Sequence, residues 1–218
     1  MKNIALIVTL AFSLAACGSK PAAPAWKADA GSSLKAFSNA YLKGDTSVAE
    51  TEFARARMEV ASTGRPDLVA HAELYRCATR VASIEYDACP GFAAVAQDAT
   101  PAEHAYAQYL AGHWDGLDAA LLPEQQRAVV QGKGTLAAIV DPLSRLVAAG
   151  VLMRASRITP ADIVLATDTA SEQGWRRPLL MWLGVALKRA EAAGDTAGAA
   201  RLQRRIGLAA GGAGGAGG

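Results

Sequence analysis

Three cysteines, at positions 17, 77 and 89, are the residues best suited to covalent chemistry in this chain. A thiol can accept a lipid, ligate a metal, form a structural disulfide or act in a redox pair. A redox pair normally uses a Cys-x-x-Cys motif beside a helix start, and Cys77 and Cys89 lie too far apart to form one. Their spacing therefore favours a structural role over a redox role.

The three histidines do not form a recognisable metal or catalytic motif. No two of His71, His104 and His113 share a helix face at metal-ligand spacing, and a His-Glu-x-x-His pattern is missing. His104 and His113 each have an acidic neighbour in the sequence, but such pairs arise by chance. The sequence also lacks a Gly-x-Ser-x-Gly elbow, a phosphate loop, a dinucleotide fingerprint and a calcium loop. We therefore expect neither enzymatic activity, nor a cofactor, nor a metal site.

The start of the chain resembles the signal peptide of a bacterial lipoprotein. Lys2 precedes an apolar run over residues 4–16, and the run ends in Leu14-Ala15-Ala16-Cys17, which resembles a lipobox. A membrane-spanning helix needs about 20 apolar residues, so this run is too short to be one. The resemblance implies that residues 1–16 are removed and that Cys17 carries the lipid that anchors the mature chain to a membrane. Gly18 after the cysteine resembles the sorting signal for the outer membrane, with the protein facing the periplasm.

Lipidation of Cys17 would leave Cys77 and Cys89 as a pair in an oxidising compartment. The helix that holds Cys77 is expected to end near Glu85 or Tyr86, and Pro90 can begin the next helix. The chain can therefore return and bring Cys89 beside Cys77. We expect a disulfide between them, which would close a loop of about a dozen residues and stabilise the fold by about 3 kcal/mol in the chain-entropy model.

Composition indicates an all-α fold. Alanine accounts for 50 of the 218 residues, while valine and isoleucine are sparse and do not alternate with polar residues. The formal net charge is only +2, so no strong field would attract nucleic acid. We expect residues 32–209 to form a single domain of about nine short helices.

Capping patterns predict where several helices begin. Thr100-Pro101-Ala102-Glu103 and Thr159-Pro160-Ala161-Asp162 each supply a capping hydroxyl, a proline at the first helical position and an acidic residue in the first turn. Ser47-Val48-Ala49-Glu50 fits a capping box. Asp141-Pro142 should divide the apolar segment 136–152 into a short piece and a longer helix.

Glycines predict where helices end, because glycine readily adopts the left-handed conformation that caps a helix. The predicted stops are Gly44, Gly64, Gly112, Gly150, Gly174 and Gly194.

The segment Leu179–Ala190 is apolar on most sides and is expected to be the central helix.

Two terminal segments have the composition of linkers. Residues 17–31 are rich in proline, glycine and alanine, and are expected to form the lipidated N-terminus and a flexible tether. Residues 210–218 are almost entirely glycine and alanine, so we expect a disordered tail.

Two helical turns resemble the tetratricopeptide repeat family. Gly44-Asp45, followed by Ala49, Phe53 and Ala56, is similar to the second half of such a repeat, and Gly194-Asp195 with Ala199 resembles the same turn. The resemblance implies antiparallel helical hairpins that stack into an α-solenoid with a concave surface for peptides or proteins. The alternative is an irregular α-bundle whose glycines only cap helices.

These features predict a non-catalytic, membrane-anchored scaffold or adaptor that recruits another envelope protein. The alternative is a small-ligand or cell-wall-binding module, or a degenerate hydrolase, with a pocket near His104, His113 and Trp114. A cluster of arginines and a tryptophan in the C-terminal third is the candidate interaction surface, because arginine and tryptophan are common interface anchors. The other interpretation of this cluster is a solvated helix face. The candidate surface consists of Trp175, Arg176, Arg177, Arg201, Arg204 and Arg205.

Overall fold

The computed structural model describes residues 24–211, and within this range the chain is helical and contains no strand. The prediction of an all-α fold with short helices is confirmed. The predicted signal peptide, Cys17 and residues 212–218 lie outside the described residues. The α-helices are α1 (Ala25–Lys43), α2 (Thr46–Ala61), α3 (Pro66–Val81), α4 (Pro90–Ala93), α5 (Pro101–Leu110), α6 (Glu124–Val130), α7 (Pro142–Arg154), α8 (Pro160–Glu172), α9 (Arg176–Ala192) and α10 (Thr196–Gly211).

Three short 3-10 helices complete the described elements: η1 (Ala96–Asp98), η2 (Ala119–Leu121) and η3 (Leu136–Ala138). The break predicted at Asp141-Pro142 is confirmed, because it separates η3 from α7. None of the helices between residues 24 and 211 combines the length and the apolar character needed to cross a membrane.

Side-chain caps begin several of these helices. Thr100 accepts a hydrogen bond from the backbone N–H of Glu103, so the predicted cap of α5 is confirmed. The Glu103 carboxylate in turn accepts from the backbone N–H of Thr100, which completes a capping box. Thr159 begins α8 in the same way. The cap predicted at Ser47 is wrong: α2 is capped two residues earlier, by Asp45, whose carboxylate accepts from the N–H of Val48 at 3.1 Å.

Five of the six glycines predicted to end helices have a positive φ, as at Gly44 after α1, where φ is 97°. Gly150 is the exception, because it lies inside α7. A Cβ atom there would overlap the backbone carbonyl oxygen of Val81. Gly150 therefore allows α7 to approach the end of α3 closely, and the prediction that it ends a helix is wrong.

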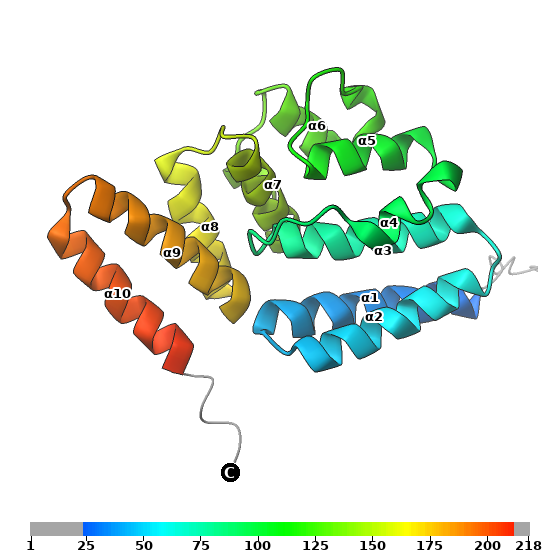
Figure 1. Ribbon diagram of the computed structural model, residues 1–218, viewed down its shortest axis with the longest axis horizontal. Helices are drawn as coiled ribbons and strands as arrows, with labels where there is room; N and C mark the ends of the chain where they lie inside the picture. The colour runs from blue at the N-terminus through cyan, green and yellow to red at the C-terminus, as the bar shows by residue number, and fades with distance from the viewer. Residues whose placement is uncertain (1–23, 212–218) are drawn as a thin grey trace, which may run out of the picture.

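Helices α3 and α7 form the centre of the main hydrophobic core. α3 lies between the α1–α2 hairpin on one side and α5 on the other (Figure 1). α7 buries six consecutive residues, from Leu146 to Val151. α9 buries only Pro178, Trp182 and Leu183, so the prediction that Leu179–Ala190 is the central helix is wrong.

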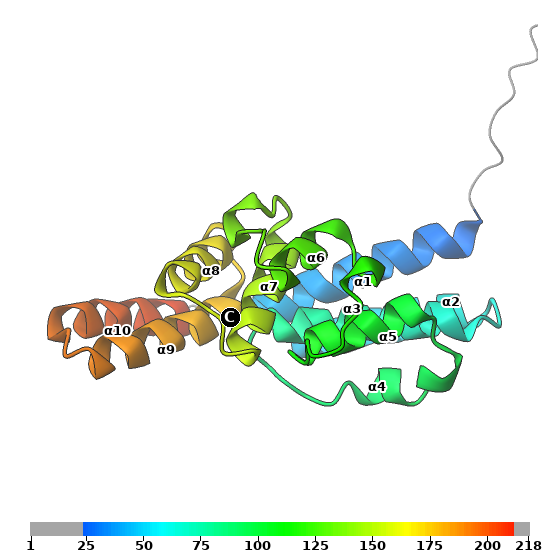
Figure 2. The same cartoon turned by 90° about the horizontal axis from the view of Figure 1, so that it is seen from above.

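The helical part of the chain begins and ends differently from what its composition suggests. α1 starts at Ala25, and Trp26 packs against a small cluster that includes buried Ala30 and Val60. Residues 25–31 therefore belong to a packed helix and not to the expected tether. α10 continues to Gly211, through the start of the expected tail. The α9–α10 hairpin lies at the end of the molecule opposite the start of α1 (Figures 1 and 2).

Candidate functional site

Two cavities meet at Tyr75, on the middle of α3. The first, about 470 Å³, lies between α3, α5 and residues 121–126. The second, about 760 Å³, lies between α1, the start of α7 and the turn between α8 and α9. Because Tyr75 lines both cavities, we treat them together as one site and call it the Tyr75 groove.

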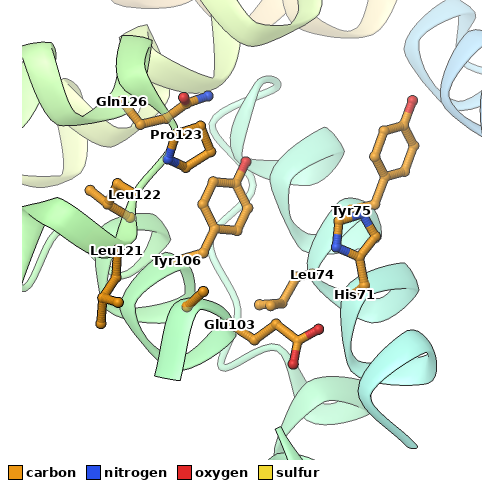
Figure 3. A pocket seen from close by; sticks show the side chains of 10 residues that line it. His71, Leu74, Tyr75, Glu103, Tyr106, Leu121, Leu122, Pro123 and Gln126 are labelled. Atoms are coloured by element: carbon orange, nitrogen blue, oxygen red, sulfur yellow. The ribbon is translucent and has the colours of Figure 1, made fainter. Parts of the chain in front are cut away.

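The first cavity has apolar walls and a polar rim. Leu74 and Tyr75 of α3 stand on one side, and Tyr106 of α5 stands on the other with Leu121 and Leu122 behind it (Figure 3). The polar atoms of the lining come from His71, Glu103, Gln126 and the two tyrosine hydroxyls. Such a cavity suits an apolar group that carries one or two hydrogen-bonding atoms.

Helical spacing and local hydrogen bonds position these side chains. His71, Leu74 and Tyr75 are three and four residues apart, so they share one face of α3. The segment that carries Leu121 and Leu122 is held by Arg127, whose guanidinium donates to the carbonyl oxygens of Ala120 and Leu122 at 3.2 and 3.1 Å. The wall opposite α3 is therefore a fixed part of the fold.

The second cavity is more polar. Lys35 and Asn39 of α1 line one side, and Asp141 and Trp175 line the other. The Tyr75 hydroxyl donates to the Ser38 hydroxyl at 2.9 Å, and Ser38 donates to the backbone oxygen of Lys35 at 3.1 Å. These two hydrogen bonds fix the ring of Tyr75 at the junction of the two cavities.

Burial raises the pKa of both tyrosine hydroxyls of the groove. At Tyr75 the hydrogen bond with Ser38 partly opposes this effect. At Tyr106 the neighbouring Tyr75 adds to it. Both hydroxyls are protonated at physiological pH, as tyrosine ordinarily is, and the raised pKa values extend this state to more alkaline pH.

The predicted interaction surface is divided between two places. Trp175, Arg176 and Arg177 lie at the start of α9, where it meets the α1–α2 turn, and Trp175 lines the Tyr75 groove. Arg201, Arg204 and Arg205 lie exposed on α10, which packs chiefly against α9. The six residues thus lie on two elements, the start of α9 and the exposed face of α10.

Arg177 links the start of α9 to the α1–α2 turn and to the loop after α3. Its guanidinium donates to the backbone oxygen of Tyr41 at 2.8 Å, to the Thr46 hydroxyl at 2.6 Å and to the Glu85 carboxylate at 3.2 Å. It also lies over the ring of Tyr41, 4.2 Å from the centroid. Burial and the hydrogen bond to Glu85 raise the pKa of Tyr41. Arg177 is thus committed to internal contacts.

The residues of the alternative ligand site are only partly brought together. His113 and Trp114 line a cavity of about 440 Å³, and the Arg157 guanidinium lies over the Trp114 ring, 4.8 Å from its centroid. His104 does not line this cavity. Its ring packs edge-on against Phe92, with 5.8 Å between the centroids.

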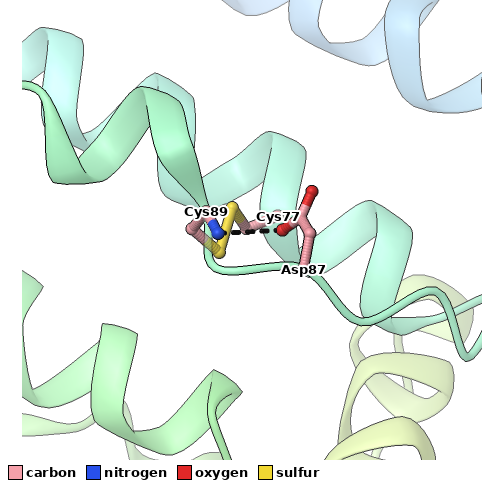
Figure 4. A group of neighbouring side chains, drawn as sticks. All are labelled: Cys77, Asp87 and Cys89. Carbon is pink, nitrogen blue, oxygen red and sulfur yellow. Dashed lines mark hydrogen bonds between the residues drawn. A yellow bond between two sulfur atoms is a disulfide. The ribbon is translucent and has the colours of Figure 1, made fainter.

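Cys77 of α3 and Cys89 of the following loop lie at disulfide distance, with their Cα atoms 5.8 Å apart (Figure 4). Asp87 lies beside them, and its carboxylate accepts from the backbone N–H of Cys89 at 2.9 Å. The same carboxylate forms an ion pair with Arg80 at 3.3 Å. Because the sulfur atoms bond to each other and Asp87 pairs with Arg80, this cluster acts as a structural link between α3 and the loop.

The sequence contains no local motif for the Tyr75 groove, because its walls come from α1, α3, α5, the start of α7 and the turn between α8 and α9. The signal in the sequence is weak: Tyr75 and Tyr106 are aromatic residues with a polar group on helix faces that also carry apolar residues. Such a tyrosine is equally common in an ordinary core.

Comparison of the chain with protein-family models, with curated proteins and with solved structures found no match.

Proposed function

We propose that this protein is an outer-membrane-anchored lipoprotein of the bacterial envelope that works as a non-catalytic scaffold or adaptor. It binds an extended segment of another envelope protein in the Tyr75 groove. The membrane address is supported by the lipobox-like sequence that ends at Cys17. The binding role is supported by the groove itself.

The observation that carries the proposal is the junction of two unlike cavities at one fixed side chain. An extended peptide places successive side chains on alternate faces, so residues two apart can fill neighbouring pockets. An apolar side chain fits the first cavity, between Tyr75 and Leu121. A polar or charged side chain fits the second, where Lys35 and Asp141 offer opposite charges. The groove therefore suits a protein segment with an apolar anchor followed by a polar one.

The lining of the first cavity does not favour catalysis. It contains no serine, cysteine or threonine that could act as a nucleophile. Its carboxylate, Glu103, accepts the backbone N–H of Thr100 at 2.8 Å as part of the α5 cap. These residues are suited to binding.

A pair of matched substitutions tests the proposal. Ala102 is exposed at the edge of the first cavity, and Ala161 is exposed at the same position of the second Thr-Pro-Ala capping sequence, away from the groove. Ala102→Trp fills the cavity from its rim, whereas Ala161→Trp makes the same change in the same local context.

The two full-length variants and the wild type are crosslinked in the envelope and purified. We expect one dominant partner with the wild type and with Ala161→Trp, and at least tenfold less of it with Ala102→Trp. Equal recovery with both tryptophan variants would overturn the groove as the binding site. In the same fractionation, Cys17→Ala should leave the membrane fraction; retention there would contradict the lipid anchor.

The alternative is a small-ligand-binding module, which is favoured by the volume of the first cavity, about 470 Å³. This volume lies in the range of small-molecule sites. Recovery of a small molecule or wall fragment with the wild type, its loss with Ala102→Trp, and no enriched protein would support this alternative.

A further inference from the structure

A second groove lies between α9 and the pair α7–α8, and it is separate from the Tyr75 groove. Its volume is about 510 Å³, and its walls are apolar side chains from four segments of the chain. We call it the α9 groove. Its apolar lining includes Ile84, Met153, Ile163, Leu180, Met181 and Val185.

The lining remains partly open to solvent. Met181 has 42% of its surface exposed, although it is a large apolar residue in the middle of a helix. Met153 lines the opposite wall. Methionine side chains are flexible and polarizable, and they adapt well to apolar ligands. The exposed methionine therefore indicates a surface that a flexible apolar molecule would cover.

Gly184 widens this groove at a cost to the helix. A glycine in the middle of a helix destabilises it by about 1 kcal/mol relative to alanine. Packing explains such a glycine at position 150, where a Cβ atom would meet the backbone of Val81. Among the described residues, nothing lies within 4 Å of the position of a Cβ at Gly184. Packing among these residues does not require glycine there, and its effect is to leave the groove open.

Two cations line the groove. Lys188 lies one helical turn after Gly184, and Arg189 lies one turn after Val185, and Ala192 continues the lining beyond them. Both cations are exposed, and within residues 24–211 neither forms an ion pair. The groove thus combines apolar walls with two exposed positive charges.

We propose that the α9 groove binds a fatty acid. The acyl chain lies along Leu180, Gly184 and Met181, and the carboxylate meets Lys188 and Arg189. An apolar groove that carries two exposed cations matches one flexible chain with one negative group. This proposal does not depend on the Tyr75 groove, so the experiment on one groove does not decide the function of the other.

Photolabelling of the full-length protein tests this site. The protein is held in nanodiscs of phosphatidylcholine and exposed to dodecanoate that carries a photoreactive group at its methyl end. We expect the label on the tryptic peptide that contains Leu180 and Lys188. Partitioning of the probe into lipid is the same for every variant, so differences in labelling between variants report binding in the α9 groove.

Gly184→Leu fills the groove and should reduce this labelling at least tenfold. Gly207→Leu is its matched control, because Gly207 also lies within a helix, has nothing near its Cβ position and lines none of the cavities described above. Gly207→Leu should label like the wild type. Equal labelling of Gly184→Leu and Gly207→Leu would overturn the proposal.

Recognition of the carboxylate by Lys188 and Arg189 is tested separately, with substitutions at exposed positions that leave the packing of the groove unchanged. The double change Lys188→Glu and Arg189→Glu should weaken labelling about fivefold, as expected for exposed ion pairs. Unlabelled dodecanoate should compete better than dodecanol, which has the same chain and no charge. Equal competition by dodecanol, or full labelling of the double variant, would contradict recognition of the carboxylate.

Discussion

Arg176 and Arg177 both pack near the α1–α2 turn, and among the described residues Arg177 also forms hydrogen bonds there. Its partner Glu85 lies 92 residues earlier in the chain. No local pattern links two residues at that separation, so the sequence predicted an exposed arginine where the structure has an internal one. The pair Cys77 and Cys89 could be predicted because a separation of 12 residues is short enough for one turn of the chain to bring them together.

The tyrosines give a prediction for the pH dependence of stability. The chain has five tyrosines. Burial is the largest cause that raises the pKa of each of them, and it raises that of Tyr86 to about 12. The unfolded value is about 10, so the folded state favours the neutral form.

The stability contributed by these neutral tyrosines should be complete below pH 10 and should fall as the pH rises toward their folded values. Each tyrosine that stays neutral in the fold contributes a slope of about 1.4 kcal/mol per pH unit in that window. Absorbance of tyrosinate, followed together with circular dichroism, should show ionisation that accompanies loss of helix. Ionisation of all five near pH 10 with intact helices would contradict the prediction.

Among the helical elements, two starts could be predicted well and two ends could not. The Thr-Pro-Ala sequences predicted the caps at Thr100 and Thr159, because all the atoms involved lie within four residues. The helix that holds Cys77 ends at Val81 and not near Glu85 or Tyr86. Asp45 caps α2 in place of Ser47, a choice between two suitable residues two positions apart. Gly150 resembles a helix stop in the sequence, and only its contact with α3 reveals its role.

Two glycine substitutions should therefore have opposite effects on stability. Gly150→Ala places a Cβ against the carbonyl of Val81 and should destabilise the protein by about 1 to 3 kcal/mol, as overpacking does. Gly184→Ala meets open space and should stabilise α9 by about 1 kcal/mol. Urea unfolding followed by circular dichroism measures both. A neutral Gly150→Ala would show that α3 and α7 do not pack closely there.

At the scale of the whole molecule, composition predicted the fold class but not the location of the core. An alanine-rich chain with few β-branched residues is all-α, as predicted. The apolar character of α9 was interpreted as burial, whereas Met181 and its neighbours line a groove that is open to solvent. Single-helix patterns cannot distinguish a core face from the wall of a binding groove. The Tyr75 groove is formed by segments more than 100 residues apart, from Ser32 to Trp175, so it could be found only in the structure.

The central claim, that the Tyr75 groove holds a segment of another envelope protein, is tested most directly by photocrosslinking in living cells. A photoreactive residue is placed at Leu121, which is 39% exposed at the rim of the first cavity, or at Met58, which is 66% exposed on α2 and away from the groove. We expect a single crosslinked protein with the probe at Leu121 that is absent with the probe at Met58. The same protein crosslinked equally at both positions, or at neither, would contradict it.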